Sequence, residues 1–172
     1  MRKGKIYTAL IIASILFFVI ILEIKLNSRF EKKPSRALIC IDWENLTSIH
    51  VNTTKGNLHF LKTEGVWYIV SDKRYRADEN KMQGLINSLS VLEKNKEIDD
   101  PNPDYKKYNL DKPPVVLKLI SGTEELQFKF GVKTAVGEEV YVMIPGDEKI
   151  YLTNAYILFR FFWSFDQYRD KR

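Results

Sequence analysis

The sequence holds few of the residues that most often carry chemistry in proteins. Its 172 residues include one cysteine and two histidines. The lone Cys40 cannot form an internal disulfide, and a single thiol does not indicate a redox compartment. His50 and His59 can approach each other in a hairpin that turns at Gly56, but a structural zinc site normally needs three or four ligands. We therefore predict neither a metal site nor a cysteine nucleophile.

Phosphate-binding loops, calcium loops and strongly basic surfaces are also missing. No glycine-rich stretch ends in the Gly-Lys-Ser/Thr of a phosphate-binding loop. The acidic stretch of residues 99–104 is broken by prolines and lacks the central glycine of a calcium loop. The net charge is +5, and three of these charges lie at Arg2, Lys3 and Lys5. Because the rest of the chain is almost balanced, we expect no nucleic-acid partner, and we expect no cofactor.

The longest apolar run lies close to the N-terminus. Residues 6–22 carry no charge, and a helix that continues to Leu26 would span about 31 Å, which matches a hydrocarbon core of about 30 Å. A buried helix of a soluble domain would show a polar face, and this run shows none. A cleaved signal peptide would have small residues after the run, whereas Glu23 and Lys25 follow it. We predict an uncleaved transmembrane anchor in residues 1–26 and a polar linker in residues 27–36.

The charges that flank this segment leave its orientation open. Three basic residues precede it, and five follow it closely, at Lys25, Arg29, Lys32, Lys33 and Arg36. The positive-inside rule therefore gives a nearly even balance. A short basic tip before an apolar run is also how secretory signal-anchors begin. Charge alone supports an exported domain and a cytoplasmic domain equally.

The rest of the chain is organised around one amphipathic helix. Asp78 is a suitable N-cap, and Glu79 lies in the first turn, where the helix dipole favours an anion. Asn95 is the predicted C-terminal cap. The stripe needs a sheet to cover it, and we expect Trp67 to pack in the core beside this helix. The apolar residues of the stripe recur at helical spacing and are Met82, Leu85, Ile86, Leu89 and Leu92.

Strand-like segments flank the helix on both sides. Alternating or β-branched runs predict three strands before it, in residues 48–53, 58–62 and 66–70, and residues 37–41 are a further short candidate. Four more strands are predicted after it, in residues 115–120, 125–130, 140–144 and 150–152. We predict an α+β fold of antiparallel β meanders packed on the central amphipathic helix, in one domain over residues 37–172. The order meander, helix, meander indicates two β-rich lobes that share the helix.

Two features near the helix have competing interpretations. Arg74 and Arg76 flank Tyr75 just before the helix and are candidate contacts for an anion at its N-terminus, or solvated cations beside a buried tyrosine. Gly84 and Ser88 lie one turn apart, off the apolar stripe. They permit a close backbone contact, or Gly84 is a tolerated surface glycine.

The segment of residues 156–165 holds more aromatic surface than one core stripe requires. Asn154 can cap a helix of residues 155–165, in which only Arg160 and Ser164 interrupt the apolar and aromatic residues after position 155. The helix is too short to span a bilayer. It either closes the domain between sheet and loops, or its outer face docks a partner protein or the membrane surface, where tryptophan and arginine are favoured anchors. The candidate docking residues are Tyr156, Phe159, Arg160, Phe162 and Trp163.

Several short motifs occur in an order that resembles the DUF4340 family over roughly residues 46–171. Gly65-Val66-Trp67 ends a hairpin, Tyr75-Arg76-Ala77-Asp78 opens the helix, and Tyr108-Asn109-Leu110-Asp111-Lys112-Pro113 stands where the family commonly shows Tyr-Gly-Leu-Asp-x-Pro. Asn109 replaces the usual glycine, and because both residues tolerate left-handed backbone we expect the turn to be kept. The later motifs are Phe130-Gly131, Glu139-Val140-Tyr141-Val142, Ile150-Tyr151 and Tyr168-Arg169-Asp170-Lys171.

The resemblance implies an exported domain that is tethered to the bacterial inner membrane. Some relatives are auxiliary subunits of ABC-type transporters, including transporters linked to gliding motility, and no catalytic residues carry over. The favoured hypothesis is a membrane-anchored, non-enzymatic extracytoplasmic accessory protein of an envelope assembly, with the lipid bilayer and ABC-transporter-like subunits as partners. The first alternative is an envelope sensor or enzyme that uses a cleft between two β-rich lobes. The second is a cytoplasmic adaptor.

Overall fold

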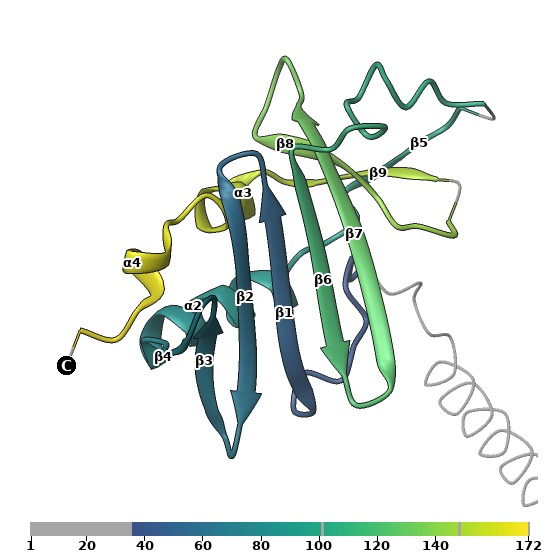
Figure 1. The fold of residues 1–172 in the computed structure, drawn as a ribbon. Helices are drawn as coiled ribbons and strands as arrows, with labels where there is room; N and C mark the ends of the chain where they lie inside the picture. The colour runs from purple at the N-terminus through teal and green to yellow at the C-terminus, as the bar shows by residue number, and fades with distance from the viewer. Residues whose placement is uncertain (1–35, 101, 148, 172) are drawn as a thin grey trace, which may run out of the picture. The chain divides into compact units, whose positions relative to one another are not determined.

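Antiparallel strands form a single nine-stranded sheet in the computed structural model, which describes residues 36–100, 102–147 and 149–171. The order across the sheet is β4-β3-β2-β1-β6-β7-β8-β9-β5 (Figure 1). Because β1 pairs with both β2 and β6, the two predicted meanders share one sheet and do not form the two β-rich lobes expected on either side of the helix. The strands are β1 (Leu46–Thr53), β2 (Gly56–Thr63), β3 (Val66–Val70), β4 (Arg74–Arg76), β5 (Lys96–Ile98), β6 (Val115–Ser121), β7 (Glu124–Lys133), β8 (Glu139–Met143) and β9 (Ile150–Asn154).

The strands with an alternating sequence pattern are the ones that sequence reasoning found. Each of the seven segments predicted on either side of the helix is a strand within a few residues of its expected bounds. The strands β4 and β5 were not predicted, because strands of three residues are too short to show an alternating pattern. Residues 37–41 do not form the candidate strand, and Ala37 makes only an isolated bridge with Glu93.

The central helix α2 spans Glu79–Ser90 and begins as predicted. The Asp78 carboxylate accepts a hydrogen bond from the backbone N–H of Lys81, at 3.1 Å. The helix ends earlier than expected, with Val91 and not Asn95 as its C-cap. The chain beyond it is extended, since Leu38 N donates to the Leu92 carbonyl at 2.8 Å. Backbone pairing of Leu92 with Leu38 therefore takes the place of the last helical turn that was predicted before Asn95.

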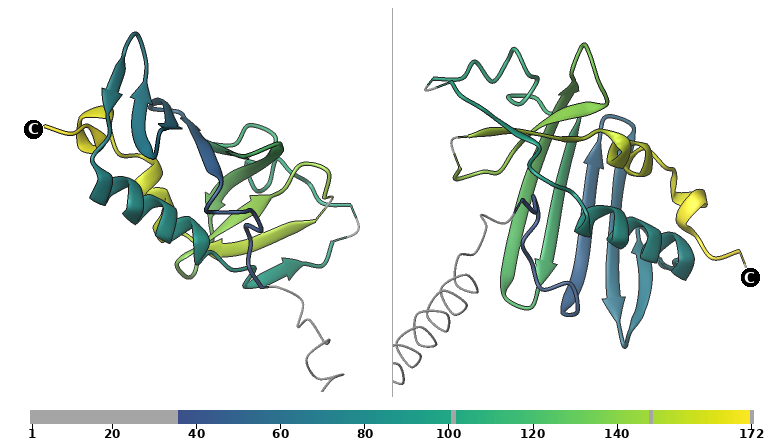
Figure 2. Two further views of the ribbon diagram at one scale, coloured as in Figure 1. Left: turned by 90° about the horizontal axis from the view of Figure 1, so that it is seen from below. Right: turned by 180° about the vertical axis from the view of Figure 1, so that it is seen from behind.

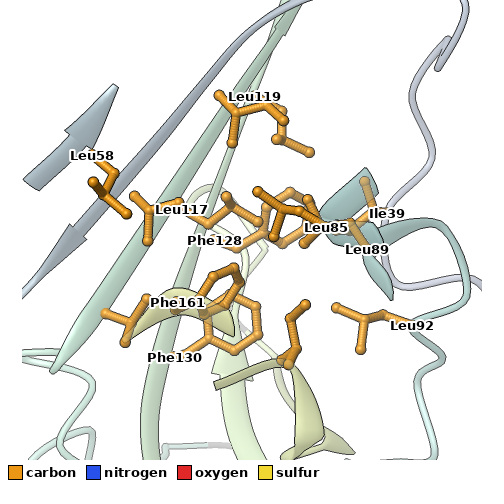
Figure 3. Close-up of a cluster of buried hydrophobic side chains, with 14 of the residues drawn as sticks. Ile39, Leu58, Leu85, Leu89, Leu92, Leu117, Leu119, Phe128, Phe130 and Phe161 are labelled. Carbon is orange, nitrogen blue, oxygen red and sulfur yellow. The ribbon is translucent and has the colours of Figure 1, made fainter. Parts of the chain in front are cut away.

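The hydrophobic core lies between α2 and one face of the sheet (Figure 3). Met82, Leu85 and Leu89 are fully buried there, and Trp67, which is 8 % exposed, belongs to the same cluster. Two short helices, α3 (Tyr156–Phe161) and α4 (Phe165–Tyr168), lie on this face as well (Figure 2). The predicted helix of residues 155–165 is thus broken, although Asn154 does accept a hydrogen bond from the Tyr156 N–H, at 2.8 Å. The sheet residues of the core include Ile49, Phe60, Leu117, Phe128 and Phe130.

A second, smaller cluster forms where the turn of residues 105–110 packs on the sheet. The Tyr108 ring lies 4.5 Å from the ring of Tyr141, and Leu110 is buried beside it. Asn109 has a φ of 53°, so the predicted left-handed turn is confirmed. A Cβ at Gly131 would overlap the Tyr108 carbonyl oxygen, which accepts a hydrogen bond from Val132 N. Motifs that carried the family resemblance therefore meet here and hold the turn on β7.

The predicted anchor and almost all of the linker lie outside the described residues. Within residues 36–100, 102–147 and 149–171, no helix is long and apolar enough to cross a membrane.

Candidate functional site: an aromatic stripe and a groove

One side of α3 displays its aromatic residues to solvent. We call Tyr156, Phe159 and Trp163 the aromatic stripe, because their spacing places them on one side of this segment. Trp163 follows the end of α3 and is half-buried against the core. The rings of Tyr156 and Phe159 are 6.5 Å apart, and those of Phe159 and Trp163 are 5.8 Å apart. Tyr156 and Phe159 are each 62 % exposed, whereas Ile157 and Phe161 on the other side are in the core. The segment thus has features of both interpretations: one side of α3 closes the core, and the other side is exposed, as a docking surface would be.

A groove of about 840 Å³ lies beside the aromatic stripe. It runs between α3, the β1–β2 turn and the end of β7, which lie at the same end of the sheet (Figure 1). Three segments that are far apart in the sequence therefore build it. Its lining includes Lys55, Lys133, Glu138, Leu158 and Phe162 in addition to the stripe.

Cations border the stripe and the groove. The Lys55 Nζ lies 5.4 Å from the ring centroid of Phe162. The Lys81 Nζ and the Arg160 guanidinium lie 5.1 Å and 5.2 Å from the ring of Trp163. In the described part of the chain, the three ion pairs join other residues, so none of these cations forms an ion pair. The site is thus aromatic and positively charged.

Gly84 makes room for one of these cations. A Cβ at Gly84 would lie 3.1 Å from the Arg160 Nη1. The close contact that Gly84 permits is therefore with a side chain of α3 and not with a second backbone. The Arg160 carbonyl accepts a hydrogen bond from the Tyr168 hydroxyl at 3.0 Å, and burial raises the pKa of Tyr168, so this donor stays neutral. The Arg160 Nε and the Trp163 Nε1 are buried and have no hydrogen-bond partner among the described residues.

The predicted anion contacts lie on the edge strand β4. Arg74 and Arg76 are exposed and line a hollow of about 720 Å³ together with the C-terminal residues Arg169 and Lys171. The Arg76 Nε lies 3.8 Å from an oxygen of Asp170. The N-terminus of α2 is capped by its own carboxylate at Asp78. Anion binding by Arg74 and Arg76 stays a prediction. In the structure Asp78 caps the N-terminus of α2 and Asp170 lies beside Arg76.

The two histidines do meet across β1 and β2, as the hairpin predicted. The ring centroids of His50 and His59 are 3.8 Å apart and the rings are nearly parallel. Both Nε2 atoms lie within hydrogen-bond distance of the buried Ser48 hydroxyl, at 3.1 Å and 3.2 Å. Burial lowers the pKa of both histidines, and the charges of His59 and Lys118 lower that of His50 further. No cluster of three or more metal-ligating side chains occurs among the residues that the structure describes.

Sequence reasoning found the aromatic stripe but missed the groove. Lys55 and Lys133 lie in ordinary turn and strand-end positions, and nothing local links them to α3. Gly84, a glycine in the middle of a helix that costs about 1 kcal/mol relative to alanine, signals only the packing of Arg160 against α2.

Fold and site together define a mostly antiparallel β-sheet domain with short helices on one face and two exposed aromatic residues on α3. The family model described as "Domain of unknown function (DUF4340)" matches residues 67–172. This is more than half of the chain, and the protein belongs to the DUF4340 family. Neither a curated protein nor a solved structure matches the chain. The matched region begins in β3, so it contains α2, both short helices and the aromatic stripe.

Proposed function

We propose that this protein is a membrane-anchored, non-enzymatic extracytoplasmic accessory protein that binds another protein of a bacterial envelope assembly through the aromatic stripe and its groove. The exposure of Tyr156 and Phe159 is the observation that carries the proposal. Single exposed apolar residues are common on protein surfaces, but contiguous ones beside a groove are typical of interaction sites. Aromatic residues and arginine are also the types enriched at interface hot spots.

The apolar run of residues 6–22 supports the membrane location in this proposal. The flanking charges do not decide the orientation, and the family resemblance favours an inner-membrane protein with a periplasmic domain. A subunit of an ABC-type transporter is the partner class that the resemblance suggests. A reporter that is active only outside the cytoplasm, fused after Arg172, tests the orientation: an inactive reporter would favour the cytoplasmic adaptor instead.

Native gel electrophoresis of gently solubilised membranes tests the partner. We expect the full chain to migrate in a complex with another membrane protein, and Tyr156→Ser with Phe159→Ser to weaken that complex. Val91→Ser is the matched control, because Val91 is 73 % exposed and lies after α2, away from the groove lining. If the wild-type chain runs as a lone monomer, the proposed function is wrong.

The alternative function, an envelope sensor or enzyme, was expected to use a cleft between two β-rich lobes. The pairing of β1 with β6 joins both meanders directly, with six consecutive residue pairs in register from Ser48↔Ile120 to Thr53↔Val115. A ligand site would therefore need a different location from the one that the meander order suggested.

A further inference from the structure

We infer that the groove beside the aromatic stripe takes an acidic, apolar segment of a protein partner. The inference rests on the proposed function, because it names the chemistry of the partner that binds at that site. It starts from the charges around the groove and from its shape.

The positive charge around the groove is not balanced. Lys55 and Lys133 line the groove, and Lys81 and Arg160 adjoin it at Trp163. Glu138 is the one carboxylate in the lining, and in the described part of the chain none of the four cations forms an ion pair. Because like charges across an interface are strongly unfavourable, a basic partner segment is disfavoured and an acidic one is favoured.

Two of these cations are held close to the apolar surface. Lys55 lies over the Phe162 ring, and Arg160 is half-buried between Gly84 and the Trp163 ring. Lys55 is exposed, whereas Arg160 is partly removed from water, and such a charge interacts more strongly with an opposite charge than a fully solvated one does. A carboxylate of the partner would interact with these cations at the border of the groove, while the partner's apolar side chains fill the groove itself.

The shape of the site favours a protein segment over other occupants. A hollow of about 840 Å³ can hold a few side chains, whereas a bilayer presents a broad surface with no protruding segment to fill it. A second copy of this chain that docked through the same face would bring the same four cations against each other. The combination of aromatic stripe, cations and groove thus fits an apolar segment that carries carboxylates at its edges.

Site-specific photo-crosslinking in the full chain tests this chemistry directly. Benzoylphenylalanine replaces Phe159, which is exposed enough to accept it, and the protein is irradiated in its native membranes. We expect an adduct with a protein, and mass spectrometry should map it to a segment with more Asp and Glu than Lys and Arg and with apolar residues between. Benzoylphenylalanine at Val91, outside the groove, should not give this adduct.

Charge reversal supplies the second arm of the experiment. Lys55→Glu with Lys133→Glu should lower the adduct yield about tenfold or more, the change that about 1.4 kcal/mol of lost affinity produces. Lys96→Glu with Lys106→Glu is the matched control, because both lysines are exposed and neither lines the groove. An equal loss in both double variants would overturn the inference.

The outcomes separate this inference from the proposed function. An adduct on a neutral or basic protein segment overturns the acidic-segment inference and leaves the accessory function in place. A lipid adduct, or no adduct while the native complex persists, also overturns it, because the partner then binds elsewhere. Absence of the adduct, together with absence of the complex from membranes that hold the wild-type chain, overturns the inference and the proposed function together.

Discussion

The helices α2 and α3 lie on the same face of one sheet, but they differ in how far their apolar residues are buried. Every apolar residue of the α2 stripe faces the core, and Met82, Leu85 and Leu89 have no exposed surface. In α3, Ile157 and Phe161 face the core, while Tyr156 and Phe159 face solvent. The difference separates apolar surface that folds the domain from apolar surface that the folded domain keeps available.

The largest effect should come from shortening the buried stripe. Leu85→Ala removes a fully buried side chain between α2 and the sheet, and we expect a loss of about 2–5 kcal/mol in the free energy of unfolding. Urea denaturation of a fragment of residues 27–172, which we expect to fold without the anchor, measures this loss. A change below about 1 kcal/mol would mean that the site collapses around the cavity or that α2 contributes little to stability.

The same contrast explains how much the sequence could predict. The α2 stripe depends on local periodicity, so its position, its N-cap and its buried face were all predictable. Its C-terminus was not, because pairing of Leu92 with Leu38 depends on a segment far away in the chain. The local apolar pattern is sufficient to predict a helix that packs one face on one sheet. It is not sufficient where a distant segment of the chain forms hydrogen bonds with the backbone groups that would continue the helix.

For α3 the sequence held a signal that went unused. Ser164 and Gln167 form the capping-box pattern Ser-x-x-Gln, and the Gln167 side chain accepts a hydrogen bond from Ser164 N at 2.7 Å. This pattern predicts a new helix start at α4 and hence the break after Phe161. Which aromatic residues stay exposed depends on the β1–β2 turn and on Arg160 packing at Gly84, and neither contact is visible in the local sequence.

A second prediction tests the contact that joins α2 to α3. Gly84→Val places a branched side chain where the Arg160 guanidinium lies, since even a Cβ would be 3.1 Å from its Nη1. Overpacking of this kind typically costs about 1–3 kcal/mol, and we expect a loss of stability in that range from thermal melts. Gly84→Val in an Arg160→Ala background is the control. If the valine costs as much there, the loss comes from helix propensity and not from the contact.

A third prediction concerns the opposite face of the sheet, where the side chains of His50 and His59 lie. Burial lowers the pKa of both histidines below the ordinary value of 6.5, so the unfolded chain binds more protons once the pH falls below that value. The free energy of unfolding should therefore fall as the pH is lowered from 7.5 to 5.5. Urea midpoints across this range measure the slope, and His50→Gln with His59→Gln should flatten it. An unchanged slope in the double variant would assign the pH dependence to other groups.

The smallest effect on stability should come from the exposed side of α3. Tyr156 and Phe159 keep 62 % of their surface in solvent, so replacing both with serine removes little buried area. Substitutions at such positions usually change stability by no more than about 0.5 kcal/mol. Phe161→Ala, on the buried side of the same helix, should cost about 3–5 kcal/mol. Thermal melts of the two variants compare the two sides of one six-residue helix directly. If the serine variant unfolds as readily as Phe161→Ala, the aromatic stripe is part of the core, and the domain has no docking surface on α3.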